Sequence, residues 1–264
     1  MKNMFLAVWA YRFFIVSSIK TEFKSRFVRS KLGGFWMVLH PLAQVLVYAL
    51  ILSQIMRAKL PEVDTQYAYP IYLLSGIIAW TLFSEVLNKS LNIFISNGNL
   101  LKKMSFPKLA LPLITIGGAL INFFIFFIVM FIVFGFLGHW PYHALYWFPL
   151  LVLITLSLAV GIGIFLGTLN VFIRDIGQMM EIVLQFWFWL TPIVYMINIV
   201  PEKYHTLIML NPMTGIIMGY HNVLLYDKAP DLSLLIYPSI VAAISLVLAM
   251  IIFYKAREEM ADVL

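Results

Sequence analysis

Six long apolar segments constrain this chain more than any other feature. A helix needs about 20 mainly apolar residues to cross the hydrocarbon core of a bilayer. The sequence offers such segments at 35–56, 69–87, 111–137, 146–173, 182–200 and 234–254. Their apolar residues run continuously and do not alternate, which argues against a membrane β-barrel. The sequence therefore predicts an all-α integral membrane protein with six transmembrane helices.

Composition excludes the soluble classes of protein. Of 264 residues, 62% are hydrophobic and 11% are charged, whereas a soluble domain carries about 25% charged residues. A water-soluble enzyme, a disordered chain and a disulfide scaffold are excluded, and the absence of cysteine removes thiolate metal sites. We expect a single membrane domain over 1–264, with an interfacial helix at 1–32 and the six spans at 33–264.

The distribution of Lys and Arg predicts the orientation. With six spans and the N-terminus inside, the inner segments hold thirteen of these residues and the outer loops hold four. Such an excess is the bias expected of cytoplasmic loops. Seven spans would place Lys255 and Arg257 outside, so we expect six spans with both termini in the cytoplasm.

The N-terminal segment is typical of a helix lying in the inner membrane interface. Phe13, Val16 and Ile19 fall at helical spacing and continue an apolar stripe. A basic side accompanies this stripe, and anionic headgroups would hold it; its members include Lys20, Lys24, Arg26 and Arg29. The alternative is an ordinary basic flank of the first span.

The connection between the second and third spans resembles a docking element. Glu85 and Lys89, four residues apart with the acid first, extend the second helix toward the interface. Gly98 then breaks that helix and Pro107 ends a short basic one. The sequence thus predicts a short cytoplasmic coupling helix, carried by Asn99, Leu100, Leu101, Lys102, Lys103, Met104, Phe106 and Lys108. A plain basic connector is an equal alternative.

Segment 207–225 is long enough to span but carries Asn211, Pro212, Gly215 and Gly219. A helix exposed to lipid tolerates these residues poorly, so two re-entrant half-helices shielded by protein fit better. Gly161, Gly163 and Gly167 in the fourth span, like Gly117 and Gly118 in the third, favour close helix packing over ligand binding.

Chemistry-bearing clusters are scarce in the spans. No phosphate-binding Gly-rich motif ending in Lys–Ser or Lys–Thr occurs, so the chain does not bind ATP in that manner. The histidines lack metal-ligand spacing. Arg174 and Asp175 form a charged pair at a membrane boundary, either as a functional pair or as a local one that ends the fourth span.

Aromatic residues are abundant, and four follow one another at 186–189 in the fifth span. Four consecutive residues cover every side of a helix, so some must face protein or a pore as well as lipid. Aromatic faces carry sugar rings without fixed polar partners, although packing is the default role of each ring. The candidate pore aromatics are Trp80, Phe83, Trp187, Trp189 and Tyr195.

Several short motifs, in order, resemble the transmembrane subunit of bacterial polysaccharide ABC exporters. This type-2 group exports O-antigen, capsule and teichoic acid, and the chain is most like the O-antigen permeases. The motifs are RSKLG at 29–33 with Trp36 and Pro41, FP at 106–107, RDI at 174–176, TPIVY at 191–195, NP at 211–212, and EE at 258–259 with Ala261 and Asp262. The chain departs from the pattern at His221, where many relatives carry Arg.

The resemblance implies a function and partners. Two copies would pair around a pore in the bacterial inner membrane, and each would bind a cytoplasmic ATPase subunit through the segment near 99–108. ATP and Mg²⁺ would bind that ATPase, so the chain would have no cofactor and no catalytic residues. A lipid-linked polysaccharide would pass outward, and no nucleic acid partner is expected.

Other functions remain open at this point. Capsular polysaccharide or teichoic acid export would use the same mechanism, but the few basic residues in the spans favour a neutral O-antigen glycan. A membrane-embedded transferase acting on lipid-linked sugars would need a convergent acid or His cluster. A channel would need a filter motif. The sequence shows neither.

Overall fold

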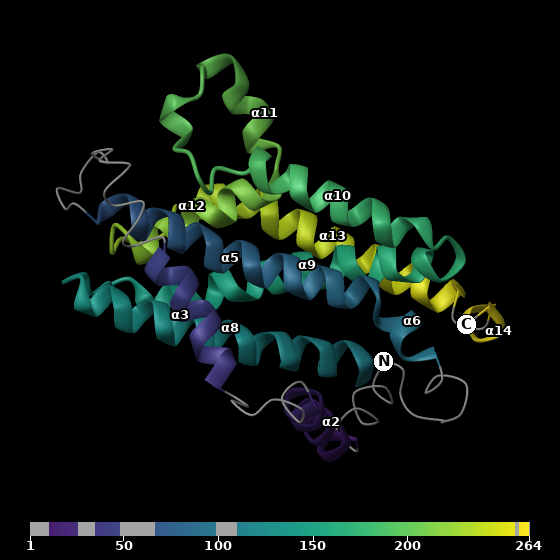
Figure 1. Ribbon diagram of the computed structural model, residues 1–264. Coiled ribbons are helices and arrows are strands. Elements are labelled where there is room, and N and C mark those ends of the chain that lie inside the picture. Colours follow the sequence, from purple (N-terminus) through teal and green to yellow (C-terminus); the bar gives the residue numbers. More distant parts are fainter. Residues whose placement is uncertain (1–10, 26–34, 48–66, 99–109, 257–258, 264) are drawn as a thin grey trace.

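The computed structural model describes residues 11–25, 35–47, 67–98, 110–256 and 259–263, and throughout these ranges the regular structure is helical (Figure 1). Within these ranges, four helices are long and apolar enough to cross a membrane. They are α5 (Ala68–Leu91), α8 (Ala110–Phe136), α9 (Phe148–Phe172), which the 3₁₀ turn η2 (Leu145–Trp147) precedes, and α13 (Leu232–Ala256). The predicted all-α class is thereby confirmed, four of the six predicted spans are confirmed as helices of sufficient length and apolar character, and the count of six stays a prediction.

The two remaining predicted spans differ from the four. For the first, the structure describes α3 (Phe35–Val47), and the rest of 35–56 lies outside the described residues. For the fifth, the predicted bounds of 182–200 are wrong, because α10 (Asp175–Leu190) begins and ends earlier. Sixteen residues make a helix of about 24 Å, shorter than the hydrocarbon core of about 30 Å.

The end of α10 has a local cause. Thr191 takes an extended conformation, with φ −103° and ψ 136°. The residue before a proline is disfavoured in the helical region, because the proline ring collides with its backbone. Pro192 therefore stops the helix inside a run of apolar residues that hydropathy alone reads as continuous.

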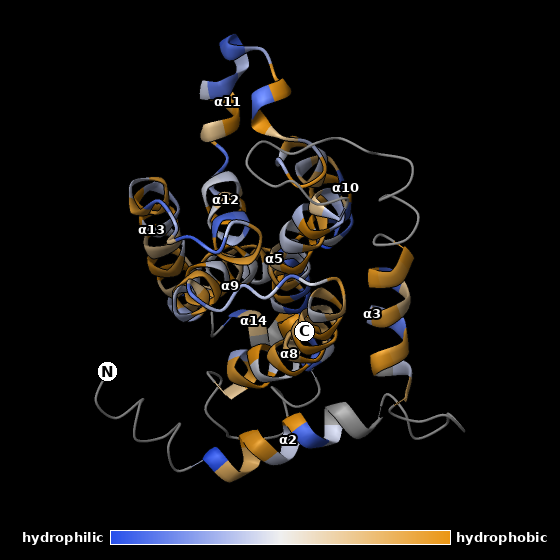
Figure 2. Ribbon diagram, turned by 90° about the vertical axis from the view of Figure 1, so that its left-hand side faces the viewer, coloured by the Kyte–Doolittle hydropathy of each residue, from blue (hydrophilic) through white to orange (hydrophobic). Residues whose placement is uncertain are grey.

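Short elements complete the chain: α2 (Arg12–Ser25), α6 (Ile93–Ser96), η3 (Ile197–Ile199), η4 (Glu202–Tyr204), α11 (His205–Met209), α12 (Pro212–Leu224) and α14 (Glu259–Val263). In Figure 2 the long helices are seen nearly end-on, and α2 runs crosswise beneath α8. This placement suits the predicted interfacial helix. The two short helices α11 and α12 occupy the region predicted to hold half-helices, and most of α12 is buried.

The core lies where α9 packs between α5 and α13 (Figure 1). In α5, 78% of the most apolar stretch is buried, against 22% in α13, so α5 is the central helix and α13 faces outward. A second buried cluster gathers the elements at one end of the bundle: Ile15, Ile93, Phe94, Ala110, Leu111, Val171 and Met260. Both ends of the 99–109 segment therefore leave from this end, beside α2 and α14.

Glycines permit the close approach of these helices, as predicted. A Cβ added to Gly167 of α9 would lie 2.5 Å from the carbonyl oxygen of Ser90 in α5. A Cβ on Gly161 would lie 2.2 Å from the Ser245 hydroxyl in α13, and one on Gly117 would lie 2.3 Å from Ile19 in α2. The small residues thus set the distances from α9 to two neighbours and from α8 to α2.

Gly167→Ala should destabilise the protein although alanine is the better helix former. The intrinsic gain is about 1 kcal/mol, but the methyl group would collide with backbone that cannot turn aside, at a cost of about 1–3 kcal/mol or more. Denaturant unfolding in detergent measures the net loss. Gly177→Ala is the matched control, because its Cβ would meet only the Asn170 side chain at 3.3 Å. Equal stability of the two variants would contradict this account.

Candidate functional site

The linker that follows α10 is held by tyrosines of α5. The Tyr69 hydroxyl donates to the Val194 carbonyl oxygen at 3.0 Å. The Tyr72 hydroxyl lies 3.1 Å from the Pro192 carbonyl oxygen and 2.9 Å from that of Tyr195. These carbonyls have lost their helical partners, and unpaired polar groups cost several kcal/mol each in hydrocarbon. Two tyrosines one turn apart on α5 thus donate hydrogen bonds to backbone carbonyls where the helix is interrupted.

Asn211 fixes the other end of the linker, where α12 begins. Its Oδ1 accepts hydrogen bonds from Trp187 Nε1 at 2.7 Å and from the Met213 backbone N–H at 3.0 Å. Its Nδ2 donates to the Thr191 hydroxyl at 2.8 Å, and that hydroxyl donates to the Trp187 carbonyl at 2.7 Å. One side chain therefore caps α12 and ties it to the last turn of α10.

His221 lies behind the linker. It is only 4% exposed, and its ring stacks on Tyr72 with centroids 3.8 Å apart. Gly76 makes room for it, since a Cβ there would lie 3.1 Å from His221 Nε2 and 3.1 Å from Ile193. The sequence placed His221 in an outer region and gave it no role. The structure places it at the packed centre of α5, α12 and the linker.

Three of the five candidate pore aromatics come together with Phe188. Trp80 lies 5.5 Å from Phe83 and 6.5 Å from Trp187, and Phe83 lies 5.1 Å from Trp187, as ring-centroid distances. Trp80 also contacts Phe188 at 5.6 Å. Phe83 is fully buried in the chain's own core, whereas Trp80 and Trp187 are half-buried.

The other two candidates lie apart from this cluster. Trp189 is 60% exposed on the outer side of α10. Tyr195 is half-buried on the linker, next to the carbonyl that Tyr72 binds. Which of the five aromatics line a path stays a prediction. The sequence did not single out Phe188, although its place in the 186–189 run was a signal.

α10 presents two unlike exposed stripes. Met180 and Leu184 are buried against the bundle. A polar stripe of Gln178, Glu181 and Gln185 is exposed on one side, at helical spacing. An apolar stripe is exposed beside it, formed by Met179, Ile182, Val183, Phe186 and Leu190. A polar stripe on a membrane helix needs water or protein against it.

Arg174 and Asp175 lie at the opposite end of α10, in the turn that follows α9. Both are exposed, and within the described residues their side chains form no ion pair with each other. Asp175 lies in the first turn of α10, where the helix dipole stabilises a carboxylate. Asn170 fixes this turn, since its Oδ1 accepts the Gly177 N–H at 3.0 Å.

The coupling residues Asn99, Leu100, Leu101, Lys102, Lys103, Met104, Phe106 and Lys108 lie outside the described residues. Among the interface-helix residues, Lys20 is exposed on α2. The Lys24 side chain, Arg26 and Arg29 lie outside the described part. In that part, no group of three His, Asp or Glu side chains is placed to hold a metal ion.

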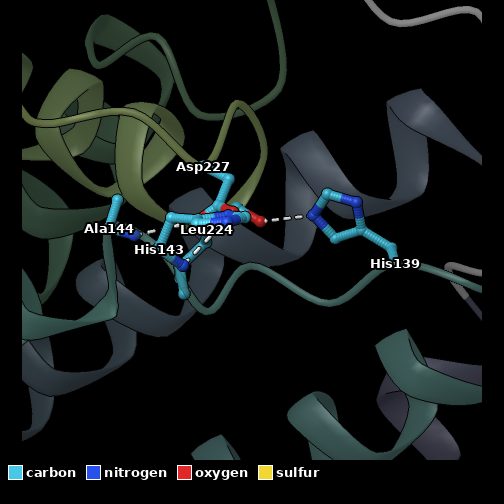
Figure 3. Close-up of polar contacts among 5 residues, drawn as sticks. All are labelled: His139, His143, Ala144, Leu224 and Asp227. Atoms are coloured by element: carbon cyan, nitrogen blue, oxygen red, sulfur yellow. Dashed lines mark hydrogen bonds and ion pairs between the residues drawn. The ribbon is translucent and has the colours of Figure 1, made fainter.

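A polar clasp joins the loop after α8 to the loop after α12 (Figure 3). Asp227 accepts the Ala144 N–H at 2.8 Å and lies 2.6 Å from His143 Nδ1. His139 Nε2 lies 2.7 Å from the Leu224 carbonyl oxygen, which makes the nitrogen the donor. Asp227 has a φ of 51°, a left-handed conformation that Asp tolerates better than most residues.

Tyr72→Phe should loosen the linker without removing the ring that stacks on His221. The one hydroxyl hydrogen that the Pro192 and Tyr195 carbonyls share would be lost, at a cost of about 1–3 kcal/mol. Hydrogen exchange should rise in segment 192–197, and the unfolding midpoint should fall. Tyr142→Phe serves as the control, because Tyr142 is exposed and its hydroxyl makes no hydrogen bond in the described structure. Unchanged exchange in the linker would contradict the assignment.

The clasp should hold at neutral pH and open in acid. Partial burial tends to raise the pKa of Asp227, but hydrogen bonds from Ala144 and His143 outweigh it and hold the pKa below its ordinary value. A lowered carboxylate pKa gives stability that is complete above about pH 4 and is lost as the pH falls through the folded pKa. Intrinsic-rate-corrected exchange of segments 139–144 and 225–228 should therefore stay protected from pH 7 to about 4.

The matched control for the clasp is Asp227→Asn, which should lower protection at pH 7 and remove its dependence on pH. Loss of protection in the original chain already between pH 7 and 5 would contradict the role given to the carboxylate.

Comparison with known proteins identifies the family. Residues 14–225 match the family model described as "ABC-2 type transporter". The chain is 28% identical to the O-antigen export system permease protein RfbA of Myxococcus xanthus, over 97% of this chain and 96% of that one. It is 27% identical to an RfbA of Klebsiella pneumoniae over 92% of each chain. It is 23% identical to the polysialic acid transport protein KpsM of Escherichia coli, over 90% of this chain and 91% of the other. The chain therefore belongs to the ABC-2 type transporter family, as a multi-pass membrane permease.

Proposed function

We propose that the chain is the permease half of an exporter that moves lipid-linked O-antigen polysaccharide from the cytoplasmic to the periplasmic side of the bacterial inner membrane. One observation carries the proposal: the similarity to O-antigen export permeases extends over nearly the whole length of both chains. Both termini would lie in the cytoplasm, as the distribution of Lys and Arg implies.

The two faces of α10 support a path between two copies. Gln178, Glu181 and Gln185 would face water in that path, and the apolar stripe beside them would face lipid or the second copy. The half-buried Trp80 and Trp187 would offer apolar faces to passing sugar rings. A polymer that must slide gains from contacts of this kind, because tight binding at one point would stall it.

ATP hydrolysis would occur in two copies of a cytoplasmic ABC ATPase, which would also bind Mg²⁺. Segment 99–108 would dock that partner. The helix before it, α6, and the start of the helix after it, α8, both lie at the end of the bundle that carries α2 and α14. No cofactor is proposed for this chain.

Export of an acidic capsular polysaccharide is the second candidate, and the similarity to a polysialic acid transport protein favours it. The described spans hold few basic side chains for a polyanion, so we prefer a neutral O-antigen glycan. Within the described residues, no group of three His, Asp or Glu side chains is placed to hold a metal ion, as a metal-dependent transferase would need.

Co-purification with the ATPase tests the function. Tagged permease, expressed with its ABC ATPase in a strain that lacks its own O-antigen exporter, should yield a complex of equal subunit numbers. That complex should hydrolyse ATP and restore surface O-antigen. Lys102→Ala with Lys103→Ala should lower both activities severalfold, and Lys203→Ala, in the η4 turn of a predicted outer loop, should not. A permease that binds no ATPase would overturn the proposal, and rescue of acidic capsule alone would replace the substrate.

A further inference from the structure

A cavity with polar side chains in its lining lies between α3, α5 and α8, three helices that consist mostly of apolar residues. Its volume is about 350 Å³, within the usual range for small-molecule sites of about 300–1,000 Å³. Five polar side chains from three helices line it: His40, Gln44, Thr81, Glu85 and Asn122. The indole of Trp36, 48% exposed, forms part of the wall.

An ionic network fixes one side of the cavity. Asn122 Nδ2 donates to Glu85 Oε1 at 2.6 Å, and Lys89 Nζ lies 2.8 Å from the same oxygen. The side chains of Glu85 and Lys89 are each 22% exposed. Asn122 lies near the middle of the 27-residue helix α8, so this network reaches well into the membrane span. Polar groups at such depth are costly and indicate a function by default.

The charges of this network select the kind of ligand. Glu85 would repel a phosphate or a carboxylate, and its pairing with Lys89 leaves no net charge to attract a cation. An uncharged polar ligand fits this balance.

Hydrogen-bonding capacity also remains open. Within the described structure, Glu85 Oε2, the Gln44 amide and the Thr81 hydroxyl have no hydrogen-bond partner. The Thr81 carbonyl, not its hydroxyl, accepts the bond from Ser84. The cavity therefore presents acceptors and donors in mixed order, as the hydroxyl groups of a sugar ring require.

We propose that this cavity is a subsite for an uncharged sugar residue, with Glu85, Gln44 and Thr81 binding ring hydroxyls and Trp36 supplying an apolar wall. As a step on the export path, the subsite rests on the function proposed above. Trp80 of the aromatic cluster precedes Thr81 of the cavity in α5, so one helix carries both surfaces. The affinity would be weak, because a transported polymer must leave again.

The chain has no cysteine, so a single introduced thiol reports on the cavity. Ile125→Cys places it in the lining without removing a polar group. In lipid nanodiscs, N-ethylmaleimide should react with this thiol more slowly when octyl glucoside is added below its micellar concentration. Octyl phosphocholine, with the same alkyl chain and a zwitterionic headgroup whose phosphate Glu85 would repel, should protect less. Ile128→Cys, on an exposed part of α8, should show no difference between the two.

Variants of the polar lining separate binding from packing. Thr81→Val and Gln44→Met keep side-chain volume and break no hydrogen bond of the described structure. Combined with Ile125→Cys they should abolish the glucoside-specific protection, whereas Thr115→Val, elsewhere on α8, should preserve it. Equal protection by both amphiphiles, or protection unchanged in the lining variants, would overturn the subsite.

The outcome is distinguishable from failure of the proposed function. O-antigen export that persists while the glucoside-specific protection is absent would overturn the subsite alone. Glucoside-specific protection in a chain that binds no ATPase and exports no O-antigen would support a sugar site and overturn the transport role.

Discussion

The hydrogen-bonding demand of the backbone in hydrocarbon governs this molecule most strongly where a helix stops. A regular helix satisfies its own N–H and C=O groups, but Pro192 interrupts α10 before it has crossed the core. The carbonyls that follow are then bonded to Tyr69 and Tyr72, and Asn211 starts α12. The rings of Tyr69 and Tyr72 are also buried in the core, so the same residues form the hydrogen bonds to the backbone and contribute to the packing.

Close helix packing supplies the platform for this arrangement. Gly161 and Gly167 let α9 approach α13 and α5 to distances that no larger side chain allows. α5 is thereby held centrally, with its tyrosines toward the linker and Thr81 and Glu85 toward α3 and α8. The peripheral helices α10 and α13 carry exposed apolar faces.

Features that depend on local sequence could be predicted, and features that depend on pairing across the chain could not. Continuous apolar runs predicted six spans, of which four are helices long and apolar enough to cross a membrane in the described structure, and small residues predicted close packing. The Glu85–Lys89 pair followed from its four-residue spacing. The end of α10 was missed because hydropathy does not register a proline between apolar residues.

The candidate site was harder to predict than the fold. The aromatic run at 186–189 pointed to Trp187, but its bond to Asn211 joins residues 24 apart in sequence. Asn122 and Glu85 are 37 residues apart in sequence, and His221 contacts Tyr72 from another helix. No periodicity in the sequence predicts either contact. These contacts arise only after the helices have packed.

The bonded linker has a mechanical consequence. Segment 192–195 is tied to α5 through backbone carbonyls, and Trp187 and Phe188 hold the adjoining end of α10, whereas the rest of α10 has only Met180 and Leu184 buried. Force applied at the Asp175 end would therefore rotate α10 as a rigid body about Thr191, while α5 stays in place and resists the movement.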